Sequence, residues 1–374
     1  MNIQESNSRL LITSGDSLIL FDFNSRKNQS VKVPPPELPP NLTKGQMEVL
    51  NKQDRTINSL SVSRDGQYIA VSTENKQVII YDRELNIKKN FIVNRTTSKL
   101  VFSNTGDILV ADRTGDVFLY KFNDEKNEPV LLLGHLSMIL DVALSECGKY
   151  IVTCDRDEKI RVSHFPNTYN IISYCLGHEE FVTTVKIVQN ILISASGDGT
   201  VRLWNYLKGE QLNVINTNQH VNNADLLEHF SKEMDKEKVD VTALPITDMQ
   251  ICSHSDCLFV AVSLFNYNGI QIYKVKTDTH EWSHHQTIQP VEIPHKFYLS
   301  SNLYIFNNNK LISYKYVNCS YQIDPCTQME DFYKKFDYIL KLTDNNFITV
   351  LYKRKFDNVQ EYLERKKLRL ETSK

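Results

Sequence analysis

The sequence predicts an all-β protein built from repeated four-stranded units. Two stretches, 134–163 and 177–204, align with each other from end to end, and both open with a Gly-His pair. The second stretch passes through a Gly-Asp-Gly turn and ends at Trp204. A repeat of roughly 40–45 residues with these landmarks is the signature of a WD-repeat β-propeller.

The number of units follows from the position that Trp204 occupies. In the other units, this position is held by a residue, usually aromatic, after an alternating apolar run. The seven anchors are Phe21, Tyr81, Tyr120, Ser163, Trp204, Tyr273 and Tyr314. Four short strands cannot bury both faces of their sheet, whereas neighbours stacked in a ring supply the second face. We therefore predict a seven-bladed WD-repeat β-propeller over residues 1–352.

Two stretches are too long for the repeat and are interpreted as insertions, at about 31–57 and 207–243. The first contains Pro34-Pro35-Pro36, which favours an extended loop. In the second, Asn223 is expected to cap a helix whose apolar face carries Leu226, Leu227 and Phe230. Residues 353–374 are predicted to form a short, charged C-terminal helix or tail.

Buried polar residues are expected inside the unit that ends at Trp204. His178, Asp198, the indole N–H and a serine, either Ser194 or Ser196, can form one hydrogen-bond chain in which each buried polar group has a partner. These residues are therefore interpreted as structural, not catalytic.

The preceding unit has the same kind of residues without the indole. Here we expect His135, Thr153 and Asp157 to form the network, and Ser163 stands where the next unit has Trp204.

Bulk properties exclude several classes of protein. The formal net charge is −2, so the whole chain is no general polyanion binder. Neither a signal peptide nor an apolar run of membrane-spanning length is recognised, which predicts a soluble, intracellular protein without membrane contact. The seven cysteines have no framework spacing, and buried, reduced thiols are expected at Cys154 and Cys175.

No catalytic or cofactor-binding constellation was found. The chain has no Gly-rich phosphate loop, so no nucleotide cofactor is expected. Cys252, His254 and Cys257 could offer ligands to zinc, but a structural site needs four ligands and no second pair lies nearby. We therefore expect no enzyme activity and no metal.

The segment 155–161 is the most densely charged hairpin of the repeat. It falls between the second and third strands of its unit and contains Arg156, Glu158, Lys159 and Arg161. One interpretation is a solvated ion network, which contributes little. The other is a docking patch, because alternating charges in a rigid turn suit a complementary protein surface better than a nucleic acid.

Three motifs are more specific than the general repeat. Residues 134–142 read Gly-His-Leu-Ser-Met-Ile-Leu-Asp-Val, residues 155–163 read Asp-Arg-Asp-Glu-Lys-Ile-Arg-Val-Ser, and residues 175–182 read Cys-Leu-Gly-His-Glu-Glu-Phe-Val. Over about 100–206, the chain resembles the WD-repeat, non-catalytic subunit of the eukaryotic tRNA (guanine-N7) methyltransferase.

The resemblance implies a nuclear heterodimer. A separate catalytic subunit would bind S-adenosylmethionine and methylate guanine N7 in the tRNA variable loop, while the propeller holds that subunit in its active conformation. It also implies that the hairpin residues Glu158, Lys159 and Arg161 lie at the subunit interface, with Arg161 as the leading candidate.

Two further hypotheses concern other partners. The tail carries eight basic and four acidic residues in an otherwise acidic chain. This suggests a tRNA contact, although a solvated helix that merely aids solubility is the alternative. The basic cluster of the tail consists of Arg365, Lys366, Lys367 and Arg369.

Other functions are possible for the whole chain. The alternatives are a generic interaction platform, such as a ubiquitin-ligase substrate adaptor or a chromatin scaffold, and an enzyme in the central channel.

Overall fold

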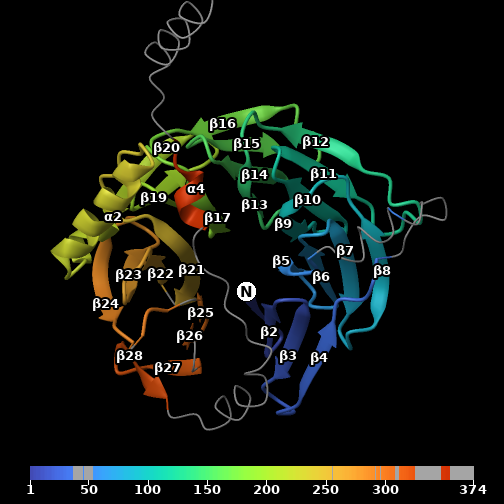
Figure 1. The fold of residues 1–374 in the computed structure, drawn as a ribbon, viewed down its shortest axis with the longest axis horizontal. Helices are drawn as coiled ribbons and strands as arrows, with labels where there is room; N and C mark the ends of the chain where they lie inside the picture. Colours follow the sequence, from blue (N-terminus) through green and yellow to red (C-terminus); the bar gives the residue numbers. More distant parts are fainter. Residues whose placement is uncertain are drawn as a thin grey trace, which may run out of the picture.

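Seven antiparallel sheets of four strands each form a ring around a central channel (Figure 1). The computed structural model describes residues 1–36, 45, 54–254, 256–290, 292–294, 296–307, 311–324 and 347–353. Each sheet is one blade, and its four strands are consecutive in the sequence. The predicted seven-bladed β-propeller is confirmed.

The strands of the first four blades have the following bounds. Blades 1 and 2 contain β1 (Asn2–Ser6), β2 (Arg9–Ser14), β3 (Ser17–Asp22), β4 (Asn28–Lys32), β5 (Ile57–Val62), β6 (Tyr68–Thr73), β7 (Gln77–Asp82) and β8 (Ile87–Ile92). Blades 3 and 4 contain β9 (Thr97–Phe102), β10 (Ile108–Asp112), β11 (Asp116–Tyr120), β12 (Val130–Gly134), β13 (Ile139–Leu144), β14 (Tyr150–Asp155), β15 (Ile160–His164) and β16 (Ile171–Cys175).

The remaining three blades complete the ring. They contain β17 (Val182–Val188), β18 (Ile191–Ser196), β19 (Thr200–Asn205), β20 (Glu210–Asn216), β21 (Ile246–His254), β22 (Cys257–Leu264), β23 (Ile270–Lys276), β24 (Trp282–Ile288), β25 (Lys296–Leu299), β26 (Asn302–Phe306), β27 (Leu311–Val317) and β28 (Ser320–Asp324).

The repeat positions that predicted the blades all occupy equivalent places. Every anchor residue lies in the third strand of its blade and is buried, with at most 6% of its surface exposed. Apolar clusters fill the spaces between neighbouring blades, as between Ile19 of blade 1 and Tyr304 of blade 7. Stacking therefore supplies the second face that a single sheet lacks.

The second insertion is shorter than predicted. Residues 210–216 of the expected range form β20, the outer strand of blade 5, and the excursion from the ring runs from there to β21. It contains η1 (Thr217–His220) and α2 (Ala224–Lys236). The Asn223 side chain accepts a hydrogen bond from the Asp225 N–H at 3.2 Å, which confirms the predicted N-cap.

Helix α2 covers the outer side of blades 5 and 6 (Figure 1). Phe230 and Met234 are buried in the cluster that these blades share, and Leu226 and Leu227 pack against it. The first insertion is described only at 31–36, 45 and 54–57, so most of it lies outside the described residues.

A short C-terminal segment, 347–353, returns to the ring beside blade 5. It begins with α4 (Phe347–Leu351), and Ile348, Leu351 and Tyr352 join the same apolar cluster as α2. The tail 354–374, with the four basic residues proposed for tRNA, lies outside the described residues.

The structure bears on the expectations about buried cysteines and membrane-spanning helices. Cys154 and Cys175 are buried and free, and burial raises the pKa of the Cys175 thiol to about 12. Among the helices of the described part, none is both long and apolar enough to cross a membrane.

Candidate partner-docking surface

The charged hairpin 155–161 connects β14 to β15 and is held in one shape by Asp155. The Asp155 Oδ1 atom accepts hydrogen bonds from the N–H groups of Asp157 at 2.9 Å and Lys159 at 3.0 Å. Glu158 has a φ of 64°, in the left-handed region that a non-glycine residue adopts only when its surroundings hold it there. The hairpin therefore presents its charges from a rigid turn.

The same aspartate replaces Asp157 in the predicted internal network. His135 Nδ1 lies 2.8 Å from Asp155 Oδ2, and His135 Nε2 lies 2.7 Å from Thr153 Oγ1. The prediction of Asp157 in this role was wrong, because it transferred the register of the next blade without allowing for a different turn. Asp157 instead contacts Lys353, at 3.5 Å.

In blade 5, the predicted hydrogen-bond chain is present with Ser194 as its serine. His178 Nδ1 lies 2.9 Å from Asp198 Oδ2, and His178 Nε2 lies 2.8 Å from Ser194 Oγ. The Trp204 indole N–H donates to the same hydroxyl at 2.8 Å. Ser196 has another role, since its hydroxyl donates to the Glu180 carbonyl.

Titration of these groups agrees with a structural role. Burial alone would raise the pKa of Asp198, but hydrogen bonds from His178, Thr200 and the Glu179 N–H outweigh it and lower the pKa to about 2. Burial lowers the pKa of His178, against the opposing effect of Asp198. A neutral imidazole between a carboxylate and a hydroxyl satisfies every buried group.

Ser163 changes the surroundings of Arg161 in blade 4. Because a small serine stands where blade 5 has Trp204, the Arg161 guanidinium can bond to its hydroxyl, at 3.0 Å. The guanidinium also donates to the carbonyl oxygens of Thr168 at 2.8 Å and Gly134 at 3.3 Å. Arg161, predicted as the leading partner residue, is thus half-buried and fastens the turn before β16.

Arg156 and Glu158 contact the chain's own C-terminal segment. Arg156 donates to the carbonyl oxygens of Leu351 at 2.8 Å and Tyr352 at 2.9 Å. The Lys353 ammonium lies 2.5 Å from Glu158. Both residues were predicted to bind an external partner, and this internal contact was not anticipated.

Tyr352 anchors the segment. Its ring packs edge-to-face on Phe181 with centroids 4.9 Å apart, and its hydroxyl donates to the Gly197 carbonyl at 3.1 Å. Gly197 packs closely against Phe181. A Cβ atom at this position would come within 2.5 Å of the ring, so a larger residue would clash. The apolar run 347–352 was the signal that could have revealed this docking.

Lys159 is the predicted hairpin residue whose side chain faces solvent. It is exposed, and its ammonium makes no hydrogen bond or ion pair within the described part of the chain. Of the four hairpin residues, it is therefore the one most available to an acidic partner.

Exposed apolar side chains lie in and next to the outer strands β12 of blade 3 and β16 of blade 4. Arg161 pairs with Tyr174 across β15 and β16, and the Thr168 hydroxyl donates to the Leu132 carbonyl of blade 3. Clustered exposed apolar residues mark interaction sites more often than single ones. This apolar rim consists of Val130, Leu131, Tyr169, Ile171, Tyr174 and Leu176, whose exposure ranges from 42% to 77%.

Sequence reasoning did not select this apolar rim. The apolar pairs 130–131 and 171–172 in outer strands carried the signal, but periodicity alone does not separate an exposed strand face from a buried one.

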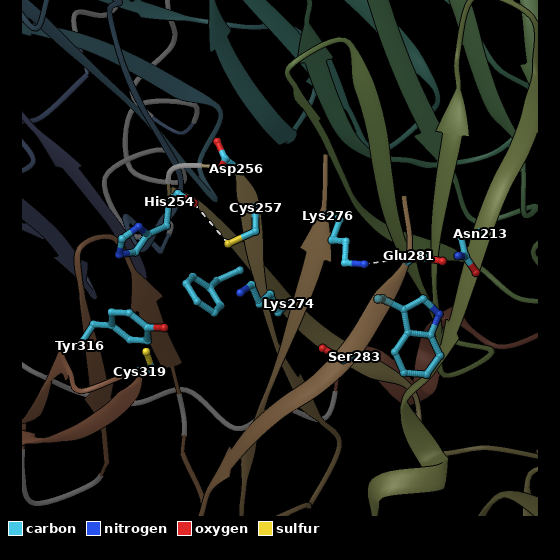
Figure 2. Close-up of a pocket in the computed structure, with 12 residues that line it drawn as sticks. Asn213, His254, Asp256, Cys257, Lys274, Lys276, Glu281, Ser283, Tyr316 and Cys319 are labelled. Atoms are coloured by element: carbon cyan, nitrogen blue, oxygen red, sulfur yellow. Dashed lines mark hydrogen bonds and ion pairs between the residues drawn. The ribbon is translucent and has the colours of Figure 1, made fainter. Parts of the chain in front are cut away.

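A hollow of about 790 Å³ lies away from the hairpin, across the outer side of blades 5 to 7. Figure 2 shows two contacts among the residues that line it. The Cys257 thiol donates to the His254 carbonyl at 3.2 Å, and Lys276 pairs with Glu281 at 2.8 Å. Within the described ranges, no three His, Cys, Asp or Glu side chains are grouped to hold a metal.

The repeated blades and the internal histidine networks together define a WD-repeat β-propeller. Residues 120–296 match the family model for the tRNA methyltransferase TRM82 WD40 domain, and residues 46–82 match the WD domain, G-beta repeat. The chain belongs to the family of non-catalytic subunits of tRNA (guanine-N(7)-)-methyltransferase.

Relatives in animals support this assignment over most of the chain. The subunit wuho of Drosophila pseudoobscura pseudoobscura is 32% identical over 366 residues, which cover 91% of this chain and 86% of that protein. The subunit wdr4 of Xenopus laevis is 31% identical, covering 83% of this chain and 80% of the relative. The human subunit WDR4 is 36% identical over 55% of this chain and 50% of its own length.

Solved structures match the fold at low sequence identity. A chain of the mitotic checkpoint complex superposes with a TM-score of 0.63 at 14% identity, covering 83% of this chain and 84% of that chain. The structure of U3-55K gives a TM-score of 0.60 at 17% identity, covering 80% and 84%. These likenesses concern the fold alone.

Proposed function

We propose that this chain is the scaffold of a heterodimer in which it binds and stabilises the S-adenosylmethionine-dependent subunit that forms 7-methylguanine in the tRNA variable loop. The observation that carries the proposal is membership of the family of non-catalytic subunits, since such a subunit needs a catalytic partner. A nuclear location and tRNA contact through the complex belong to the same proposal.

The edge formed by blades 3 and 4 is our candidate for the subunit interface. It combines Lys159, an exposed cation without a partner among the described residues, with the apolar rim that includes Leu131, Tyr169 and Tyr174. Apolar area with aromatic anchors provides affinity, and a charge at its border sets orientation and the rate of association. We infer that the partner presents an acidic group opposite Lys159 and an apolar surface opposite the rim.

Arg161 has a different role in this proposal. Its three hydrogen bonds join β15 to the turn before β16 and to the end of β12, so it positions the rim instead of reaching the partner as a free charge. Charge reversal at Arg161 would then weaken docking by releasing the turn that carries Tyr169.

The test compares dissociation constants of purified variants for the catalytic subunit by calorimetry. Lys159→Glu should weaken binding at least about tenfold, about 1.4 kcal/mol, because it places like charges across the interface. Tyr174→Ala should weaken binding without altering the salt dependence. Lys232→Glu, an exposed lysine of helix α2 that lies away from blades 3 and 4, is the matched control and should bind as wild type.

Arg161→Lys and Arg161→Glu separate positioning from direct contact. If Arg161 positions the rim, both variants weaken binding and both increase hydrogen exchange in 165–171. If only the reversal weakens binding while exchange stays unchanged, Arg161 contacts the partner directly. Wild-type affinity in Lys159→Glu and Tyr174→Ala together would remove this edge from the interface.

Affinity purification distinguishes the generic interaction platform. Recovery of a small methyltransferase with the chain supports the proposed heterodimer, whereas recovery of a cullin-adaptor protein or chromatin components without a methyltransferase would contradict it.

A further inference from the structure

The central channel carries charged residues from five consecutive blades, and their signs alternate around the ring. Lys99 of β9, Asp141 of β13, Lys186 of β17, Asp248 of β21 and Lys296 of β25 all line one cavity of about 750 Å³. These inner strands surround the channel in Figure 1. Three cations therefore face two carboxylates in a space enclosed by protein.

Both carboxylates are already engaged. Asp141 accepts from the Lys99 ammonium at 2.9 Å and from the backbone N–H groups of Val142 and Val185, each at 3.0 Å. Asp248 accepts from the Lys296 ammonium at 2.6 Å. Within each pair, the lysine charge balances the aspartate charge. The charge of Lys186, the fifth residue, is therefore left without a paired carboxylate among the described residues.

The Lys186 ammonium forms no hydrogen bond or ion pair with any other residue in the described part of the chain. Burial lowers the pKa of Lys186, and the nearby Lys99 ammonium lowers it further, while Asp141 and Asp248 oppose the shift. Lys186 lines the same cavity as Lys99 and the two carboxylates, which places it inside the channel.

An enclosed cation with three unused N–H donors favours an anionic ligand. The Lys99 ammonium donates one of its three N–H groups to Asp141 and can turn the others into the channel. Oxygen atoms of a tetrahedral oxyanion can accept from two ammonium groups at once, and the enclosed position strengthens the attraction relative to the surface.

We propose that the central channel binds a phosphate-class oxyanion, held by Lys186 and by the remaining donors of Lys99. The ion compensates the unpaired charge and joins blades 3 and 5 across the channel. Lys296 adds to the positive field from the far side of Asp248. This site lies apart from the docking edge, so it does not depend on the proposed partner.

The first test measures thermal unfolding of the full chain in rising inorganic phosphate, against chloride at equal ionic strength. Wild type should gain melting temperature with a saturable dependence on phosphate. Lys186→Met keeps the length of the side chain but removes its charge, so it should lose this saturable gain while melting at or above the wild-type temperature without phosphate. Lys208→Met, an exposed lysine of the same blade, should respond as wild type.

Calorimetric titration with inorganic phosphate measures binding directly. One binding event per chain in wild type that is lost in Lys186→Gln supports the site. The proposal is overturned if wild type responds to phosphate as it does to chloride. It is also overturned if Lys186→Met retains the full phosphate response, because the effect would then come from general salt exclusion or from surface sites.

Discussion

Individual buried residues hold the blades in register, and the two histidine networks show how one role tolerates different partners. His178 pairs with Asp198 within the turn, whereas His135 pairs with Asp155 at the end of β14. In both blades, the imidazole links a carboxylate to a hydroxyl of the second strand. The partner of each histidine is therefore the aspartate that the folded turn brings beside the imidazole, and not the aspartate at the aligned position of the repeat.

Trp204→Ala should destabilise the propeller by about 3–5 kcal/mol, because it empties the space of a fully buried indole and leaves Ser194 without a donor. Trp204→Phe keeps most of the ring volume and removes only the N–H, so its loss should be smaller. Chemical denaturation with both variants measures the difference. Wild-type stability in Trp204→Ala would contradict a buried indole at this position.

Glu180 should make stability depend on pH in the neutral range. Burial and then the neighbouring Glu158 raise the pKa of Glu180 to about 7 from an ordinary value of 4.5. A raised folded-state pKa gives stability that is complete below 4.5 and is lost as pH rises through 7.

Glu180→Gln should therefore melt at the wild-type temperature at pH 4.5 and above it at pH 8. Glu210→Gln, which removes the same charge from an exposed side chain of blade 5, is the control. An equal difference between Glu180→Gln and wild type at both pH values would show that this carboxyl does not titrate between them.

At the scale of elements, hairpin 155–161 and segment 347–353 form one unit. The hairpin supplies Arg156 and Glu158, and the segment supplies two carbonyl oxygens and Lys353. Exposed ion pairs contribute little by themselves, so the buried ring of Tyr352 provides most of the docking energy.

Tyr352→Ala should release the segment and raise hydrogen exchange in both 347–353 and 155–161. Tyr352→Phe loses only the bond to the Gly197 carbonyl, at about 1 kcal/mol, and should raise exchange less. Val350→Ala alters a side chain that is 67% exposed and serves as the control. Unchanged exchange in Tyr352→Ala would mean that the remaining contacts suffice to hold the segment.

At the scale of the whole molecule, the described blades close into a ring without sharing a strand. Blade 1 uses the first four strands, blade 7 uses the last four, and side-chain packing joins them. The segment 347–353 then brings the chain from blade 7 back to blades 4 and 5. As a result, Lys353, the last described residue, lies at hairpin 155–161.

Removal of residues 354–374 should weaken the tRNA affinity of the heterodimer and flatten its salt dependence, because each phosphate that is neutralised releases counterions. A full-length variant with Gln at positions 365, 366, 367 and 369 should reproduce most of the loss if charge is the cause. Binding measured over a series of salt concentrations gives the slopes. Equal slopes for all three complexes would favour a tail that only aids solubility.

The sequence by itself determined the seven blades and the buried chain in blade 5. Each blade repeats the same alternation of apolar residues and the same third-strand anchor, so local pattern and global fold agree. The Asn223 cap and the apolar face of α2 were also predictable, because both depend on residues only a few positions apart in the sequence.

Only the tertiary structure decided which charged residues remain free. Arg156 and Glu158 are engaged by residues almost two hundred positions later, and Arg161 turns inward because Ser163 leaves space beside it. The charges of the channel become one group only because five blades converge on the same axis. Contacts between distant segments leave no periodic pattern in a single sequence, and therefore the docking edge and the channel emerged from the folded ring.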